Sequence, residues 1–324
     1  MTCLKCQHGT AVKAGTTNAN TPRFRCHDCG ARFTLPTPAG PLGRHTTTLD
    51  DAVRVLTLMT EGMSVRAISR VTGIHKTTIL SLLLTFGAKC ATLFDARVTG
   101  LTPRFVQADE LWTFVAKKQK RLKADDPIEF GDQYVWIAMD SESKAILSYH
   151  VGKRDASGAH ALMTDLRSRI VNRCQITTDG LEGYVEAIES AFGSQVDFAQ
   201  CIKNYAAPRT DGPDWFRPSS KVTSVEKFVK AGEPDASRIS TSHIERANLT
   251  VRMQLRRFTR LTNGFSKKLV NLEAAVAVFM AWYQFCRVHQ TLRVTPAMEA
   301  GLTGHVWTIR ELLTADVAAP AKAA

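Results

Sequence analysis

Four cysteines near the N-terminus have a spacing that suits metal binding. They form two Cys-x-x-Cys pairs, Cys3 with Cys6 and Cys26 with Cys29. Two cysteines at this spacing can reach one ion from a single tight turn, and four thiolates are a preferred tetrahedral ligand set for Zn²⁺. The alternatives are a redox-active dithiol and a chance cluster. We therefore predict a zinc ribbon over residues 1–35, in which one structural Zn²⁺ stabilises a segment too short to bury a sizeable core.

Two aspartates in the middle of the chain are candidates for a second metal site. Asp109 lies inside a strand-like stretch, where aspartate is unfavourable, and Asp179 follows a shorter strand-like stretch. Because neighbouring carboxylates repel each other, two Mg²⁺ (or Mn²⁺) ions would stabilise them while also binding water and phosphate oxygens. Asp179 precedes a glycine, so a plain turn residue is the alternative there. Side chains alternate along a strand, and we expect only one of Asp109 and Glu110 to face the site.

A third acid would complete such a site, and Glu245 is the first candidate. It lies on a predicted helix over residues 240–258, and Arg252 and Arg256 follow it on the same helical face. A metal-binding glutamate followed by arginines suits a phosphate backbone that crosses the site. A solvated glutamate is the alternative. Two weaker candidates for the third acid lie in a Pro- and Ser-containing insertion over residues 206–238: Glu226 and Glu233.

The elements that would position these acids form a mixed α/β sheet. Strand-like stretches occur at residues 105–115, 134–140, 145–151, 174–178 and 196–202, and helical stretches at residues 159–171, 184–192 and 272–285. Three antiparallel strands followed by a helix, a strand, a helix and a strand are the order of a ribonuclease H-like fold. In that fold the first strand lies beside the fourth, which brings Asp109 and Asp179 together. We predict a catalytic domain over residues 103–315 that ends in C-terminal helices, and a frayed tail over residues 316–324.

Three shorter helical stretches precede this domain, with a tight turn at Gly73: residues 49–61, 65–71 and 75–86. The pattern is typical of a helix-turn-helix domain, which we predict over residues 49–98 after a linker over residues 36–48. The start of the third helix would present hydrogen-bond donors to the phosphates and base edges of DNA: His75, Lys76, Thr77 and Thr78. The alternative is a three-helix bundle with a solvated polar face.

The composition fits a multidomain protein that binds a polyanion. The 324 residues include 42 Lys and Arg against 30 Asp and Glu, and the net charge of +12 favours double-stranded DNA as a partner. A hydrophobic content of 44% excludes a disordered or collagen-like chain. No basic and apolar leader is visible, and the most apolar run, residues 274–283, is shorter than the ~20 residues that span a bilayer. We therefore expect a cytoplasmic protein without a membrane partner, whose remaining cysteines are core thiols: Cys90, Cys174, Cys201 and Cys286.

Several of these stretches resemble the DDE transposases of bacterial insertion sequences, in particular the group named after the first insertion element. The shared stretches are Asp-Glu-Leu-Trp at 109–112, Thr-Asp-Gly at 178–180, Ile-Glu-Arg-Ala-Asn-Leu-Thr-Val-Arg at 244–252, and a tail at 285–298 that contains His289 and Arg293. The resemblance covers nearly the whole chain, and its most specific part is residues 244–298. The long spacing between Asp179 and Glu245, which contains the insertion, departs from the pattern of the group.

The resemblance implies that Asp109, Asp179 and Glu245 are a metal-binding catalytic triad. It also implies supporting or DNA-contacting roles for a further set: Arg246, Asn248, Arg252, His289 and Arg293. The expected protein is a prokaryotic, nucleoid-associated DNA transposase, at least a homodimer. It would bind the terminal inverted repeats of its element, cut their 3′ ends and join them to target DNA. The alternatives are a non-catalytic, sequence-specific DNA-binding regulator derived from a transposase, a structure-specific nuclease of the same fold, and a zinc-ribbon protein that docks to the transcription machinery.

Overall fold

The computed structural model describes residues 1–17, 21–35, 42–43, 45–206, 222–260 and 262–316. The chain divides into two compact units, Met1–Arg44 and His45–Ala324. The predicted linker at 36–48 falls partly outside the described residues, as do part of the predicted insertion and nearly all of the predicted tail. The two units are therefore considered separately.

The smaller unit is a three-stranded antiparallel sheet: β1 (Ala11–Thr16), β2 (Pro22–Cys26) and β3 (Arg32–Thr34). Its apolar packing is slight. The rings of Phe24 and Phe33 stack with centroids 6.0 Å apart, and Phe24 is buried while Phe33 is partly exposed. A sheet with so few buried side chains needs another source of stability.

Three helices begin the larger unit: α1 (Leu49–Thr60), α2 (Val65–Thr72) and α3 (Lys76–Arg97). The three predicted helices are confirmed, and their boundaries follow from local chemistry. The Ser64 side chain accepts from the backbone N–H of Ala67 at the start of α2, and Gly73 ends α2 in the left-handed conformation with φ of 74°. Val55, Ile68 and Ile79 form the core between the helices.

Helix α3 runs to Arg97, well beyond the predicted end at residue 86, because its second half packs against α7 (Leu269–Phe285). Gly87 makes this contact close: a Cβ atom at Gly87 would lie 2.4 Å from the Cβ of Ala274. By length and composition, α3 is the one helix in the described part of the chain that could cross a membrane, with 44% of its most apolar window buried. Its packing against α7 is that of a core helix, which passes the same test.

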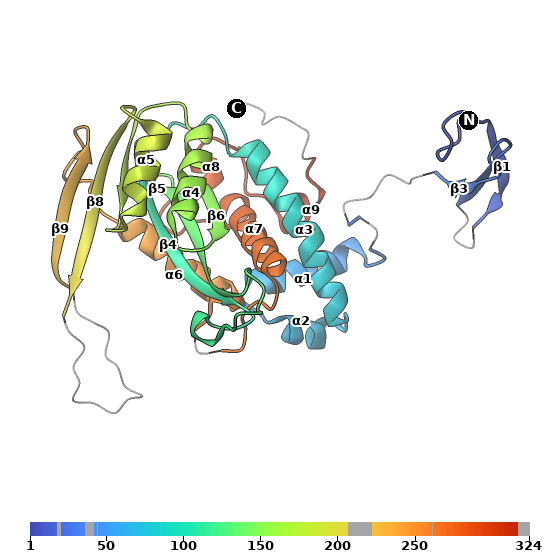
Figure 1. Ribbon diagram of the computed structural model, residues 1–324, viewed down its shortest axis with the longest axis horizontal. Coiled ribbons are helices and arrows are strands. Elements are labelled where there is room, and N and C mark those ends of the chain that lie inside the picture. Colours follow the sequence, from blue (N-terminus) through green and yellow to red (C-terminus); the bar gives the residue numbers. More distant parts are fainter. Residues whose placement is uncertain (18–20, 36–41, 44, 207–221, 261, 317–324) are drawn as a thin grey trace. The chain divides into compact units, whose positions relative to one another are not determined.

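A six-stranded sheet forms the centre of the larger unit, in the order β6-β5-β4-β7-β8-β9 (Figure 1). The strands are β4 (Phe105–Val115), β5 (Gly131–Asp140), β6 (Ile146–Gly152), β7 (Cys174–Thr178), β8 (Val196–Tyr205) and β9 (Val222–Ala231). Strand β5 runs antiparallel to both β4 and β6, β7 runs parallel to both β4 and β8, and β9 runs antiparallel to β8. The predicted mixed sheet is confirmed, and so is the prediction that its first and fourth strands lie side by side.

Helices α4 (Ala156–Arg169) and α5 (Gly183–Phe192) cover the face of the sheet on which Trp136 lies. Trp136 contacts Tyr184 of α5 edge to face at 5.7 Å, and a Cβ at Gly158 of α4 would lie 2.6 Å from its ring. Helix α6 (Ser242–Gln254) lies on the other face, where the Gln107 side chain accepts from the backbone N–H groups of His243 and Ile244. Two short helices, α8 (Pro296–Glu299) and α9 (Ile309–Thr314), follow α7.

One element in this region was not predicted, and one prediction was wrong. The predicted insertion contains β9, an edge strand that pairs with β8 and whose residues are almost all exposed, so that it has no buried face. The helix predicted over residues 240–258 ends at Gln254. Leu255 is extended, and a separate 3₁₀ turn, η2 (Arg256–Phe258), follows; the break places Leu255 and Phe258 in the core.

Candidate metal and catalytic sites

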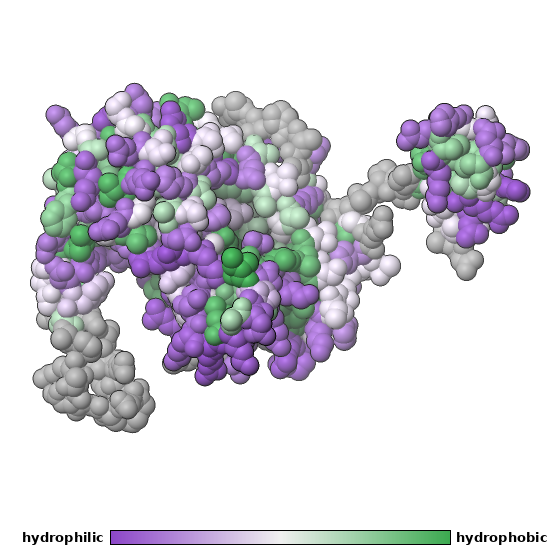
Figure 2. Space-filling model, in the orientation of Figure 1, coloured by the Kyte–Doolittle hydropathy of each residue, from purple (hydrophilic) through white to green (hydrophobic). Residues whose placement is uncertain are grey.

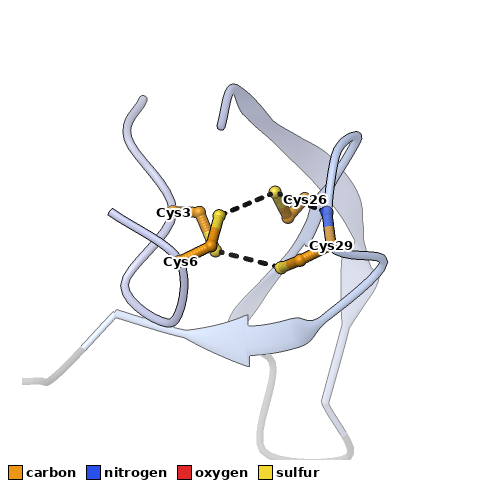
Figure 3. A group of neighbouring side chains, drawn as sticks. All are labelled: Cys3, Cys6, Cys26 and Cys29. Carbon is orange, nitrogen blue, oxygen red and sulfur yellow. Dashed lines mark hydrogen bonds between the residues drawn. The ribbon is translucent and has the colours of Figure 1, made fainter. Parts of the chain in front are cut away.

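The four N-terminal cysteines meet in the smaller unit (Figure 3). The Sγ atoms of Cys3 and Cys29 are 3.7 Å apart, as are those of Cys6 and Cys26. Zn–S bonds of about 2.3 Å in a tetrahedron place their sulfurs about 3.8 Å apart, so the observed spacing fits one Zn²⁺. Each of these two contacts joins a sulfur of one Cys-x-x-Cys pair to a sulfur of the other pair. A single site with four ligands requires such contacts between the pairs, whereas a redox-active dithiol requires only contact within one pair.

Backbone N–H groups donate to these sulfurs and favour the thiolate forms of Cys3 and Cys6. The N–H groups of Lys5 and Cys29 donate to the Sγ atoms of Cys3 and Cys26, at 3.3 and 3.5 Å. The backbone N–H groups of His8 and Gly9 lower the pKa of Cys6 to about 6. Thiolates are the form that binds zinc. A Cβ atom at Gly9 would lie 2.6 Å from the Sγ of Cys26, so this turn leaves no room for a side chain.

The other cysteines are apart from this group. Cys90, Cys174 and Cys201 are buried, as predicted, and Cys286 is half-buried. Burial raises the pKa of Cys90, Cys174 and Cys286 to about 12, so their thiols stay protonated at neutral pH.

A cluster of three acids lies where β4 and β7 part. Asp109 and Glu110 belong to β4, and Asp179 directly follows β7. One carboxylate oxygen of each lies within 4.8 Å of those of the other two. The predicted meeting of Asp109 with Asp179 is therefore confirmed, although the chain separates them widely.

Glu110 corrects the expectation that only one of the paired acids could face the site. The alternation itself holds: Asp109 receives a hydrogen bond from Asn248 of α6, whereas Glu110 receives one from Tyr184 of α5, on the opposite face. Strand β7, however, pairs with β4 only over Phe105–Gln107. Beyond that point this edge of β4 has no β7 partner, and carboxylates from both faces reach around it towards Asp179.

Like charges dominate the electrostatics of the cluster. Burial, together with the charges of Glu110 and Asp179, raises the pKa of Asp109 to about 7. Burial also raises the pKa of Glu110, an effect that Asp179 strengthens and Arg154 opposes. The Nε atom of Arg154 donates to Glu110 at 2.6 Å, and its NH2 atom lies 3.9 Å from Asp179. One arginine facing three carboxylates leaves a net negative site that suits a divalent cation.

Asn248 gives a direct test of whether a cation fits. Its Nδ2 donates to the Oδ2 of Asp109 at 2.8 Å, while its buried Oδ1 has no hydrogen-bond partner among the residues that the structure describes. A buried acceptor without a donor is unfavourable, and a metal ion or a metal-bound water would satisfy it. The donor set of carboxylates plus an amide oxygen is the one Mg²⁺ and Mn²⁺ prefer.

Glu245, the predicted third acid, lies outside this close cluster. Its Oε1 accepts from Lys203 and, at 2.7 Å, from the hydroxyl of Thr241, and its side chain is 45% exposed. Its charge contributes to the raised pKa of Asp109. The weaker candidates point elsewhere: the Glu226 side chain accepts from Asn204, and the Glu233 backbone donates to Asp197.

The residues predicted to contact DNA fall in two places. At the start of α3, His75 is the N-cap, its Nδ1 accepting from the backbone of Thr77 at 3.4 Å; Lys76 and Thr77 are exposed and Thr78 is half-buried. On and after α6, Arg246 is exposed and Arg252 half-buried. Arg256 was predicted on the same face of α6 as Glu245, but it lies in η2, beyond the end of the helix. His289 is half-buried, and Arg293 adopts a positive φ of 66° in the turn that follows α7.

No protein-family model matches the chain, and no curated protein matches it. Among solved structures, a Mos1 transposase paired-end complex with the left transposon end is 11% identical at a TM-score of 0.21, covering 48% of this chain. This chain spans 59% of the Mos1 chain. A piggyBac transposase synaptic complex with hairpin DNA is 10% identical at a TM-score of 0.34, and the match covers 83% of this chain and 71% of the piggyBac chain. A simian T-cell lymphotropic virus intasome is 13% identical at a TM-score of 0.32, and the match covers 84% of this chain and 78% of the intasome chain. At these identities and TM-scores the similarities do not establish a function for this chain, and only its own residues can indicate one.

Because its carboxylate is buried among like charges, Asp109→Asn should stabilise the metal-free protein. The folded state keeps a proton on Asp109 up to a pH of about 7, whereas the unfolded chain releases it near pH 4. The free energy of unfolding of the wild type therefore falls as the pH rises through this window. The variant does not lose this stability, because an asparagine does not titrate. We expect a gain of roughly 1–2 kcal/mol, a few degrees in Tm, at pH 8 in EDTA.

Thermal unfolding in EDTA at pH 5 and pH 8 measures this effect, and the gain should be smaller at pH 5. Asp197→Asn is the matched control, because pairing with Arg173 lowers the pKa of Asp197 and its substitution should bring no gain. An Asp109→Asn protein less stable than wild type at pH 8 would contradict the description of this site as charge-strained.

Proposed function

We propose that this protein is a DNA transposase whose larger unit is a ribonuclease H-like catalytic domain. The observation that carries the proposal is the acidic cluster at the point where β4 and β7 part, with the unpartnered Oδ1 of Asn248 beside it. The strand order β6-β5-β4-β7-β8 supports it, because that order is the one expected for this fold. Acids that share a buried edge of a sheet are explained by metal-dependent phosphoryl transfer better than by stability, since as a structural feature they are unfavourable.

In the proposed mechanism, Asp109 and Asp179 would hold two divalent cations, and Glu245 would join them as a ligand once released from its ion pair with Lys203. When bound, the cations supply an activated water or 3′-hydroxyl and stabilise the leaving oxygen at phosphorus. Asn248 fixes the carboxylate of Asp109 by its hydrogen bond. Arg154 neutralises Glu110 and keeps its charge from competing at the site.

DNA binding completes the proposal. The zinc ribbon and the helix-turn-helix helices α1–α3 would bind the terminal inverted repeats, with His75, Lys76, Thr77 and Thr78 at the start of α3. Arg246 and Arg252 on α6 would contact the phosphate backbone beside the metals. Joining two ends of an element to one target requires at least two copies of the chain. The proposed setting is the nucleoid of a prokaryotic cell.

The experiment combines the purified protein with labelled DNA from the ends that flank its gene, Mg²⁺ and a supercoiled target plasmid. We expect joined end-plus-target products from the wild type and from the exposed control Asp235→Asn, and none from Asp109→Asn. Cleavage without joining would favour a structure-specific nuclease of the same fold. Binding without cleavage in every sample would favour a DNA-binding regulator.

A further inference from the structure

A groove of about 1010 Å³ lies at the far end of β4, next to the acidic cluster along the same strand. Its walls are the end of β4, the loop that follows it, the segment from Arg256 to Arg260, and Thr262, Asn263 and Phe265. Seven lysine and arginine side chains line it, and none of the described lining residues is acidic. Figure 2 shows hydrophilic residues gathered at this end of the larger unit, with a few hydrophobic ones among them. The proposed transposase activity leaves this groove without a role.

Aromatic rings line the groove beside the cations. The rings of Trp112 and Phe114 have centroids 5.8 Å apart, and those of Phe114 and Phe265 are 4.6 Å apart. All three side chains are only partly buried. The ammonium group of Lys118 lies 5.9 Å from the ring centroid of Trp112. A row of half-exposed rings edged by cations is the combination by which proteins bind unpaired bases, through stacking, and their phosphates, through charge.

Arg257 indicates that an anion belongs here. It lines this groove and also a neighbouring cavity of about 710 Å³ between helix α3 and η2. Burial lowers the pKa of Arg257 to about 10, and no ion pair with a carboxylate is found for it among the described residues. The Arg257 side chain is only partly exposed, and a phosphate in the groove would give its guanidinium an anionic partner.

The groove lies further along the strand that carries Asp109 and Glu110 of the acidic cluster. Glu110, Trp112 and Phe114 alternate along β4 and share one face of it, so Phe114 lies about 14 Å beyond Glu110 along the strand. In the part of the chain that the structure describes, no strand pairs with the outer edge of β4 between the contact with β7 and the bridge from Val115 to Ser266. Arg252 senses charges from both places: burial lowers its pKa, the positive charge of Arg260 in the groove lowers it further, and the carboxylate of Asp109 in the cluster opposes this shift.

We propose that this groove binds the unpaired nucleotides of a DNA strand that leaves the catalytic site, with bases on the rings of Trp112 and Phe114 and phosphates on Lys118, Lys120 and Arg257. The inference rests on the proposed function for the nature of the nucleic acid and adds its form, a single strand next to the cleaved phosphodiester. Bases of an intact duplex are already paired and stacked, so they have no face to offer these rings. Opening of the DNA end beside the site follows from the proposal.

The test measures binding by fluorescence anisotropy of the zinc-loaded protein without added Mg²⁺ and without a chelator, so that no cleavage occurs and the zinc ribbon stays folded. The probes are a blunt duplex and the same duplex with a short unpaired tail. We expect the wild type to bind the tailed probe about ten-fold more tightly. Trp112→Leu should remove most of that preference and leave blunt-duplex binding within about two-fold, as expected from the loss of one stacked base. Equal affinity of the wild type for both probes would overturn the proposal, as would equal weakening of both by Trp112→Leu.

A second variant keeps the test valid if Trp112→Leu does not fold. Lys118 and Lys120 are exposed, so the double change Lys118→Gln, Lys120→Gln should fold normally. It should lower the salt dependence of tailed-probe binding by about one to two in the log–log slope, and an unchanged slope would contradict the proposal. Lys230→Gln, on the exposed strand β9, is the matched control and should leave the slope unchanged. Cleavage assays are separate: tailed-probe binding without any cleavage would refute only the proposed function, whereas cleavage without tail preference would refute only the groove.

Discussion

Glu245→Gln should reduce DNA cleavage and strand joining by about 10³-fold or more, whereas Glu110→Gln should reduce them by only about 10- to 100-fold. The two glutamates compete for the role of third acid, and the structure separates them by their partners. Glu110 is 2% exposed at its side chain and is held by Arg154 and Tyr184. Glu245 is half-exposed, and its main partner is the flexible cation Lys203, which a metal ion can displace.

The measurement is single-turnover cleavage and joining of labelled element ends, with Mg²⁺ titrated for each protein. Loss of a direct ligand should also raise the Mg²⁺ concentration needed for half-maximal rate, while loss of Glu110 should not. Glu233→Gln serves as control, because its side chain is exposed and distant in its contacts from the cluster. The reverse order of effects, with Glu110→Gln the more damaging, would make Glu110 the third ligand and Glu245 a partner of Lys203.

Removal of zinc should unfold the smaller unit and leave the larger one folded. Structural zinc sites contribute on the order of 10 kcal/mol to small domains, far more than the few buried side chains of β1–β3 can supply. We expect one Zn²⁺ per chain in the purified protein. Cys6→Ser, or a strong chelator, should abolish the dispersed amide resonances of residues 1–35 and weaken binding to element ends.

Zinc content by elemental analysis and amide resonances by NMR measure this directly. Cys286→Ser is the control, because that thiol lies in the larger unit and its loss should leave one Zn²⁺ per chain. A Cys6→Ser protein that keeps its zinc and its resonances would show that the four cysteines are not a structural site. A disulfide formed reversibly between cysteines of one pair would restore the redox alternative.

The sequence predicted well those features that depend on neighbouring residues. The bounds of β4 and β7 were predicted without error, and Ser64 and Gly73 marked the ends of α2, because capping and strand alternation act over a few residues. The juxtaposition of Asp109 and Asp179 was predicted from the order of the elements alone. It requires only that the first strand of the sheet lies beside the fourth.

The failures have a common physical cause, which is dependence on distant partners. Glu110 was not predicted in the site because side chains alternate along a strand, which places Glu110 and Asp109 on opposite faces. The two carboxylates come close only because the pairing of β7 with β4 ends at Gln107 and leaves the edge of β4 free beyond it. Strand β9 has no buried face and is held in place by its pairing with β8. Arg256 left the predicted face of α6 because Leu255 and Phe258 are drawn into the core.

The absence of a side chain at Gly87 has a consequence for how this chain could be recombined with others. At Gly87 the backbones of α3 and α7 touch, and further along α3 the Lys89 side chain donates to the carbonyl of Leu313 at 2.5 Å. Phe94 then packs edge to face on Tyr149 of the central sheet. Helices α1–α3 therefore do not form a separate domain. A fragment that ends after α3 would expose the residues of α3 from Leu83 to Phe94 that are buried in the whole chain. Under the proposed function, a change of DNA specificity would have to proceed by substitutions at the start of α3, with the rest of the helix retained.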